Sequence, residues 1–404
     1  MIVSLDRYFL ARCVLPWVEV FLTQAIQLPN GTSLMRCRLL RLLTGVYFKR
    51  ESFETSRALA HEMLALAETL PESPETLGWA LYWVVQHALT ERDWATVHHY
   101  WERLWSMYPC HEDFELHIQI HYLAGYIPWE RQPPDWRERA VREAFQQPDL
   151  LVRQSPLSAY SEELTLRGDY EKARLVCLEE VQLARQLDDP IRVGSALVTQ
   201  LFIAIQQGEL ESAEALLHEL RQLDLQVGRF ADTLLWLEGH WRLRRGEPEQ
   251  ALQAALELVA RHLPYDRPHE LGGAWDLAAL AAIAQGDLPT ALRYAENALD
   301  ARRQQEDAYR LHFSKTHYYG IRAMLQPDPE AAQALEACLV FWQEREARPW
   351  QANTLYYLAH AYKALGDLPR AKSALEEAIQ LNQAMGRQIA LQQCRALADE
   401  MATF

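Results

Sequence analysis

The sequence predicts an all-α protein, a solenoid in which pairs of helices repeat about every 40 residues. Two observations lead to this prediction. Leu, Ala, Glu, Gln and Arg, which are strong helix formers, dominate the 404 residues, whereas glycine is scarce at 16. Strands are not expected, because no runs of Val, Ile and Thr alternate with polar residues. The second observation is a short motif that returns at a fixed interval, along a chain too long for one compact core.

The repeated motif is Gly-[Asp/Glu]-x-x-x-Ala, which occurs five times. Its glycines are Gly168, Gly208, Gly246, Gly286 and Gly366, with spacings of 40, 38, 40 and 80 residues. A degenerate copy at Pro327–Glu330 lies inside the longest gap, and three weaker copies lie at 51–53, 92–94 and 134–136. These corners define nine units. Self-similarity at such a period is typical of a helical solenoid.

Each position of the motif has a physical role at the corner between two helices. Glycine ends the first helix, because it adopts the left-handed backbone conformation without a side-chain clash. The acidic residue is expected to cap the second helix, where it accepts from free N–H groups and faces the positive end of the dipole. The alanine is expected where two helices cross closely, because a larger side chain would force them apart.

The last unit carries the most complete version of the pattern. Its spaced residues are Leu355, Leu358, Ala359, Tyr362, Gly366, Ala371, Leu375 and Ala378. This unit resembles the tetratricopeptide repeat (TPR) signature over both helices, with Ala359 in place of the usual glycine. The resemblance covers most of the chain, strongly after about residue 155 and weakly before it. It implies a right-handed α-α superhelix of about nine helix pairs, closed by a capping helix at the C-terminus.

The period departs from the family's usual length of about 34 residues. The longer unit resembles the superhelical sensor domain of large ATP-dependent bacterial transcription activators of the maltotriose-responsive type. Those proteins also carry a nucleotide-binding domain and a helix-turn-helix. Here no Gly-x-x-x-x-Gly-Lys-[Ser/Thr] loop occurs, and 387–404 is too short for a DNA-binding unit. We therefore expect either a stand-alone adaptor or a fragment of such a regulator.

Four segments are expected along the chain. An N-terminal helix covers 1–30, irregular TPR-like repeats cover 31–155, regular repeats cover 156–385, and a capping helix covers 386–404. Six prolines crowd the stretch 106–156, which predicts an irregular connector with a loop near 127–134. A solenoid needs a last helix with one polar face to close its core, and 387–402 has apolar residues near helical spacing.

Composition excludes several kinds of partner. The net charge is −15 and no Lys/Arg-rich stretch occurs, so direct nucleic-acid binding is not expected. Six cysteines lie far apart without a Cys-x-x-Cys pair, which predicts reduced, mostly buried thiols in a cytoplasmic protein. No run of eighteen apolar residues occurs, so no segment is expected to span a membrane.

No motif for catalysis or for a cofactor is present. His117 and His121 are spaced for one helix face and could share a zinc ion with Cys110, His111 or Glu115, but no His-Glu-x-x-His pattern completes the site. A Gly-x-Ser-x-Gly elbow is also missing. We expect ordinary histidines, no cofactor and no enzyme activity. Most of the thirteen tryptophans are expected in the core, as large residues beside small alanine seams.

The TPR resemblance implies that the first helix of each pair lines a concave surface. Inward positions then lie thirteen, ten, six and three residues before each corner glycine. The candidates for partner contact are Asn353, Tyr356, His360, Lys363, His317, Asp276, Trp236, His240, Phe202 and Glu162. Rigid aromatic anchors among directional polar groups suit a peptide or helix. The leading hypothesis is a protein- or peptide-binding scaffold. Alternatives are a sensing domain for a small effector in a bacterial regulator, and an accessory subunit of an enzyme complex.

Overall fold

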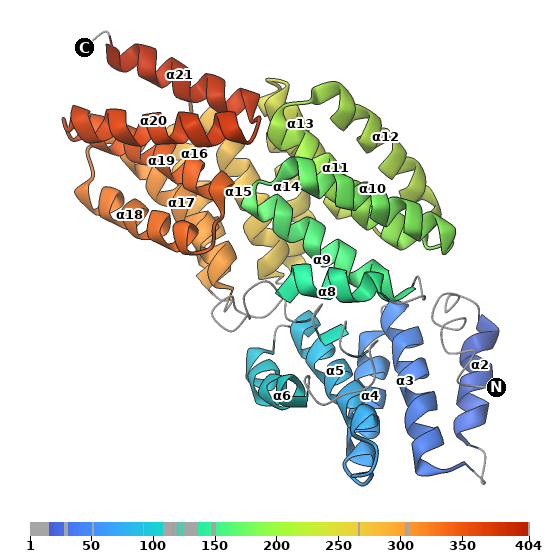
Figure 1. Ribbon diagram of the computed structural model, residues 1–404. Helices are drawn as coiled ribbons and strands as arrows, with labels where there is room; N and C mark the ends of the chain where they lie inside the picture. Colours follow the sequence, from blue (N-terminus) through green and yellow to red (C-terminus); the bar gives the residue numbers. More distant parts are fainter. Residues whose placement is uncertain are drawn as a thin grey trace. The chain divides into compact units, whose positions relative to one another are not determined.

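The computed structural model describes residues 16–27, 31–50, 52–91, 93–107, 116, 119–120, 123, 136–146, 151–265, 267–303 and 307–402. These residues fall into two compact units. Unit 1 comprises 1–159 with 183–189, and unit 2 comprises 160–182 with 190–404. All regular structure in the described ranges is helical (Figure 1), so the predicted all-α fold class is confirmed.

The helices follow one another as antiparallel pairs. Those in the first half of the chain are α2 (Pro16–Ile26), α3 (Ser33–Lys49), α4 (Phe53–Ala67), α5 (Pro74–Glu91), α6 (Trp94–Met107) and α8 (Trp136–Phe145). The array continues as α9 (Leu151–Arg167), α10 (Tyr170–Gln186), α11 (Pro190–Gln207), α12 (Leu210–Val227), α13 (Ala231–Arg244) and α14 (Pro248–His262), with a 3₁₀ turn at Leu263–Tyr265. It ends with α15 (Pro268–Ala284), α16 (Leu288–Arg303), α17 (Ala308–Leu325), α18 (Pro329–Glu344), α19 (Arg348–Ala364), α20 (Leu368–Ala384) and α21 (Gln388–Ala402).

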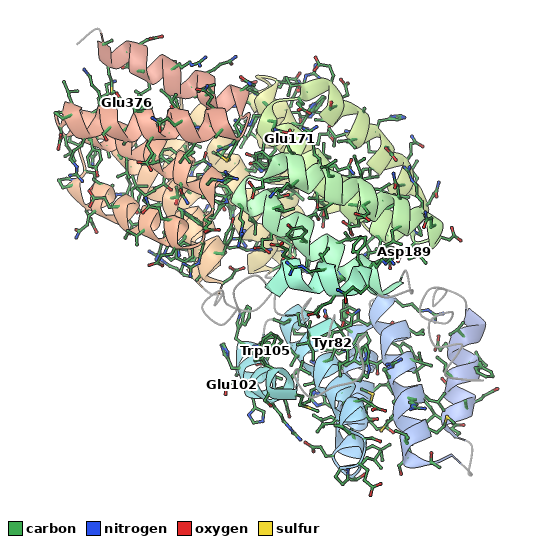
Figure 2. The ribbon with its side chains drawn as sticks, viewed as in Figure 1. Tyr82, Glu102, Trp105, Glu171, Asp189 and Glu376 are labelled. Atoms are coloured by element: carbon green, nitrogen blue, oxygen red, sulfur yellow. The ribbon has the colours of Figure 1, made fainter. Side chains whose placement is uncertain are left out.

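Unit 1 is built around α5, which is buried along most of its length. Its aromatic side chains pack edge to face: Tyr82 lies 5.5 Å from Trp79 and 5.1 Å from Trp83 between ring centroids. In Figure 2, Tyr82 on α5 and Trp105 on α6 mark this part of the unit. Trp101 stacks on Trp105 at 5.3 Å. These tryptophans fill the space between helices, as the sequence predicted.

A buried polar contact joins three helices of unit 1. The Ser56 hydroxyl on α4 donates to the backbone oxygen of Thr44 at 2.8 Å and lies 2.9 Å from Nε2 of His87 on α5. Only 1% of His87 is exposed. Burial, with smaller contributions from Arg57 and His61, lowers the pKa of His87 from 6.5 to about 4. The imidazole is therefore neutral at pH 7.

The corners have the backbone conformation that the motif predicts. The five motif glycines have φ between +77° and +80°, which ends each first helix in the left-handed region. Capping is more selective than expected. Asp367 accepts from the backbone N–H of Arg370 at 3.2 Å and Asp328 from that of Ala331 at 2.9 Å, whereas Glu209 and Glu247 make no side-chain cap bond. The prediction was thus wrong for glutamate, which is absent from the preferred N-cap residues.

Small residues line the seams between paired helices. The motif alanines are fully buried, at 0% exposure each: Ala173, Ala213, Ala251, Ala291 and Ala371. From α11 to α21, consecutive helices pack against one another, as α15 does with α14 and α16. The array finishes with α21, whose apolar face is buried at Leu391, Cys394, Leu397 and Met401. This is the stacked arrangement of helix pairs expected of a solenoid.

Unit 2 closes on itself, because its first helix pairs contact its last. Gln207, at the end of α11, donates from Nε2 to the backbone oxygen of Met385 at 3.2 Å, although 178 positions separate them. Arg387, in the turn between α20 and α21, donates from Nη2 to Oε1 of Gln206 at 3.1 Å. Figure 1 shows the end of α20 beside α11.

A second set of contacts closes the unit at the start of α19. Arg348 donates from Nε to the backbone oxygen of Arg167 at 2.7 Å and pairs with the Asp169 carboxylate. Apolar residues from both ends of the unit share one cluster here: Leu164, Tyr170, Ala173, Ile203, Ala352 and Met385. The closure therefore combines apolar burial with directional bonds from arginine.

The corner at Gly168 lies in this closure. A Cβ built there would lie 2.4 Å from Sδ of Met385 and 3.2 Å from Cδ of Pro349. At Gly246 the backbone conformation is nearly the same, with φ +80°, but nothing lies within 4 Å. Gly246 is thus required by its backbone conformation alone. Gly168 is required both by its conformation and by the close approach of α19 and α20.

Within the described ranges, no helix is both long enough and apolar enough to cross a membrane.

Gly168→Ala should destabilise the protein more than Gly246→Ala. Both variants force a side chain into the left-handed region, which costs about 1–2 kcal/mol. Only Gly168→Ala also drives a methyl group against Met385, which adds about 1–3 kcal/mol of overpacking. The free energy of unfolding from urea titrations measures the difference. Equal losses in the two variants would show that the two ends of unit 2 do not meet in solution.

His87 should make unit 1 less stable as the pH falls from 7 to 5. The unfolded state binds a proton at about pH 6.5, whereas the folded state does so only near pH 4. Stability is therefore lost on acidification across this window, by about 2 kcal/mol between pH 7 and pH 5. In His87→Gln, which keeps a polar group near Ser56 but cannot titrate, this part of the loss should disappear. Hydrogen exchange of the α5 amides at both pH values checks it; the same loss in the variant would contradict it.

Candidate functional site

One face of α13 presents an aromatic and polar stripe in unit 2. Trp236, His240 and Arg244 are spaced four residues apart, so they lie on the same side of the helix. All three are half-buried. The Trp236 ring stacks on Phe202 of α11 with 6.1 Å between centroids and planes 9° apart, and His240 meets Trp236 edge to face at 4.4 Å. The structure thus brings three of the predicted residues, Phe202, Trp236 and His240, into one group.

The electrostatic surroundings keep His240 neutral. Loss of hydration inside unit 2, reinforced by the charge of Arg244 and by His317, lowers the pKa of His240 from 6.5 to about 3. At pH 7 its ring can therefore donate one hydrogen bond and accept another. Solvent still reaches part of the side chain, so a bound group could use both functions.

The predicted residues of α19 form a second group. Tyr356 meets His360 edge to face at 4.8 Å, and both are half-buried. Burial, followed by the charge of Lys363, lowers the pKa of His360 to about 4. Nε2 of His360 is buried without a partner among the residues that the structure describes. Lys363 instead pairs with Glu400 of α21 at 2.6 Å.

Two other predicted residues are buried between helices. Asp276 of α15 and His317 of α17 are only 2% and 3% exposed. The Asp276 carboxylate accepts from the Ser314 hydroxyl at 2.8 Å, and its other oxygen lies 3.5 Å from Nδ1 of His317. The Arg302 charge also acts on Asp276. These groups bond to one another, so they hold α15 and α17 together rather than forming an open polar surface.

The remaining predicted residues are dispersed. Oδ1 of Asn353 accepts from Nη1 of Arg387 at 3.1 Å, so its amide takes part in closing unit 2. Glu162 is exposed on α9, an earlier helix than those that carry the groups on α13 and α19. The stripe on α13 and the group on α19 therefore remain the main candidates for partner contact.

The histidine pair that suggested a metal lies outside the described residues. This applies to His117 and His121 and to their neighbours Cys110, His111 and Glu115. Among the residues with a described placement, no group of three or more His, Cys, Asp or Glu side chains is arranged to hold a metal ion. Among the described residues, four cysteines are free and buried, in agreement with the sequence prediction: Cys37, Cys177, Cys338 and Cys394.

Sequence reasoning missed Arg244 in the stripe and the charged and phenolic groups that act on it. Arg244 lies two positions before Gly246, outside the four inward positions that were counted, although its spacing from Trp236 and His240 could have revealed it. Tyr170 and Arg387 act electrostatically on Arg244, as does Tyr357 of α19. No local pattern predicts these neighbours, because the closure of unit 2 brings them together over large sequence separations.

Comparisons with solved structures identify the architecture. The structure of a Rap protein complexed with Competence and Sporulation Factor matches with a TM-score of 0.69 and 12% identity, over 88% of this chain and 100% of that one. The hetero-tetramer Cut9–Hcn1 of APC/C (TM-score 0.46, 15% identity, 93% and 74% coverage) and yeast Tom70 (0.42, 12%, 99% and 88%) also match. Only the first score exceeds 0.5, and at such identity it shows the fold alone.

No protein-family model and no curated protein matches the sequence. The fold is identified by the stacked helix pairs, by the left-handed glycine corners with their buried alanines, and by the structural similarity to the Rap protein. By fold, the chain is a TPR-like helical repeat protein.

Proposed function

We propose that the chain is a non-catalytic scaffold that binds a peptide, or an extended segment of a protein, on the inner helices of unit 2. The observation that carries the proposal is the stripe on α13. Its Trp236 ring stacks on Phe202 and remains half-buried, and it is followed one turn later by a neutral His240. Aromatic anchors in partly desolvated surroundings contribute most of the energy at many protein interfaces.

The second group, on α19, extends the same kind of surface. Tyr356 and His360 combine an aromatic ring with a neutral imidazole, and both residues are half-buried. Backbone N–H and C=O groups of an extended peptide are suitable partners for such neutral polar groups. The likeness to the Rap protein, which was solved complexed with Competence and Sporulation Factor, supports the proposal. We place this function in the cytoplasm, where the free buried thiols would stay reduced.

Trp236→Ala and Tyr356→Ala should each weaken peptide binding. A degenerate pool of synthetic heptapeptides is equilibrated with the protein, and the retained peptides are identified by mass spectrometry and then titrated singly. Loss of an aromatic anchor should reduce affinity by about 1–4 kcal/mol, which corresponds to roughly fivefold to several hundredfold. Circular dichroism checks that each variant keeps its helices.

Tyr265→Ala is the matched control, because this tyrosine is 72% exposed in the 3₁₀ turn after α14. It should bind the retained peptides as the wild type does. The proposal fails if no peptide is retained, or if the retained peptides bind equally well to Trp236→Ala and Tyr356→Ala.

A further inference from the structure

Arg244 is a cation with no counter-ion among the residues that the structure describes. It ends α13 and is half-buried on the helix face that carries Trp236 and His240. Its sequence neighbours on the same turn are paired: Arg242 lies 2.6 Å from a carboxylate oxygen of Glu238, and Arg245 lies 3.2 Å from Glu247. Among the residues that the structure describes, no carboxylate pairs with Arg244.

The surroundings of Arg244 add positive charge and remove water. Loss of hydration is the main cause that lowers its pKa to about 10, and the charge of Arg387 lowers it further. The groups that oppose this shift are the phenols of Tyr170 and Tyr357. Arg244 thus stays charged at pH 7. The negative end of the α13 dipole offers modest compensation, typically below about 1 kcal/mol.

Arg387 repeats the pattern nearby. It is 2% exposed, and all four oxygens that its guanidinium reaches are neutral: those of Gln206, Pro349, Asn353 and Asn382. Its Nε has no partner among the described residues. The Arg387 charge therefore acts on Arg244 inside unit 2, and no carboxylate of the described residues is bonded to either guanidinium.

One more buried hydrogen-bond donor in the same region lacks a partner among the described residues. The Tyr170 hydroxyl is buried and has no hydrogen-bond partner among the described residues. Tyr170 acts electrostatically on Arg244, Arg387 and Tyr309, so the four side chains share one neighbourhood. Unpaired buried donors are uncommon in native proteins and call for an explanation. An acceptor with negative charge would satisfy them.

We propose that Arg244, with Arg387 and Tyr170 behind it, forms an oxyanion site on the inner face of unit 2, and that a carboxylate of the bound peptide occupies it. The peptide part rests on the proposed function. A guanidinium fork matches a carboxylate with two parallel hydrogen bonds, and such charge-assisted bonds are strong in partly desolvated surroundings. The same geometry would hold inorganic phosphate, which provides a probe that does not depend on any peptide.

The spacing along α13 sets the position of the carboxylate in the peptide. Arg244 lies eight residues after Trp236, which is about 12 Å along a helix. An extended peptide covers that length with three or four residues, at about 3.3 Å each. The bound peptide should therefore carry an apolar or aromatic side chain three or four residues from its C-terminus or from an acidic residue.

The test compares Arg244→Met with Arg245→Met. Both remove one positive charge from neighbouring positions, but Arg245 is exposed and paired. Phosphate, compared with chloride at equal ionic strength, should raise the melting temperature of the wild type and of Arg245→Met, and not that of Arg244→Met. Peptides retained from the heptapeptide pool should lose at least about tenfold in affinity for Arg244→Met. Amidated copies of these peptides show which carboxylate binds: amidation weakens binding through the C-terminus and leaves binding through an acidic side chain unchanged.

Two further measurements separate a binding role from a structural one. Without ligand, Arg244→Met should melt at a higher temperature than the wild type, because it removes an uncompensated charge. Tyr170→Phe loses only a hydroxyl that has no partner among the described residues, so it should fold normally and bind phosphate more weakly.

The site is refuted if phosphate stabilises Arg244→Met as much as the wild type, or stabilises neither protein. If phosphate binding depends on Arg244 but no peptide is retained, the proposed function fails while the oxyanion site stands. If peptides need Trp236 but bind Arg244→Met normally, the oxyanion site fails while the proposed function stands.

Discussion

The contact between the two ends of unit 2 is the constraint on which the rest of its structure depends. Met385 packs against the corner at Gly168 and accepts from Gln207, so the last helix pair cannot move away from the first. Closure places inner side chains of α13 and α19 in surroundings where water is displaced on several sides. The lowered pKa values of His240 and His360 follow from that loss of hydration. An open arc of the same helices would leave these groups solvated.

Closure also explains why an unpaired charge costs more stability inside unit 2 than at its solvent-exposed surface. The chain carries an excess of fifteen negative charges, yet no carboxylate of the described residues bonds to Arg244 or Arg387. Outer arginines such as Arg261 pair with carboxylates that solvent screens, which contributes little to stability. An inner arginine without such a partner costs stability until an anion binds. Keeping it is consistent with a binding role, since sites for ligands are often less stable than the surrounding scaffold.

Much of the fold could be predicted from the sequence because its signals are local. A glycine with positive φ ends a helix wherever it occurs, and an alanine five positions later allows the next helix to pack closely. Gly286 with Ala291 illustrates this: φ is +78° and the alanine is fully buried. The same local logic selected Phe202, Trp236 and His240 as candidates, and their rings form one group.

The charged part of the site could not be predicted in this way. Asp276 and His317 were expected on an open surface but are bonded to each other, because packing of α15 on α17 decides their exposure. The approach of Arg387 to Arg244 depends on the curvature of the whole array, which accumulates over many small angles between repeats. Periodicity fixes neither the curvature nor which distant residues meet.

The most direct test is a crystal structure of the full chain grown in sodium bromide, with anomalous diffraction used to locate the anion. The account predicts a bromide ion within about 3.5 Å of the Arg244 guanidinium, in hydrogen-bonding distance of its N–H groups. A carboxylate of the chain itself seated on Arg244, with bromide found only at outer arginines, would contradict it.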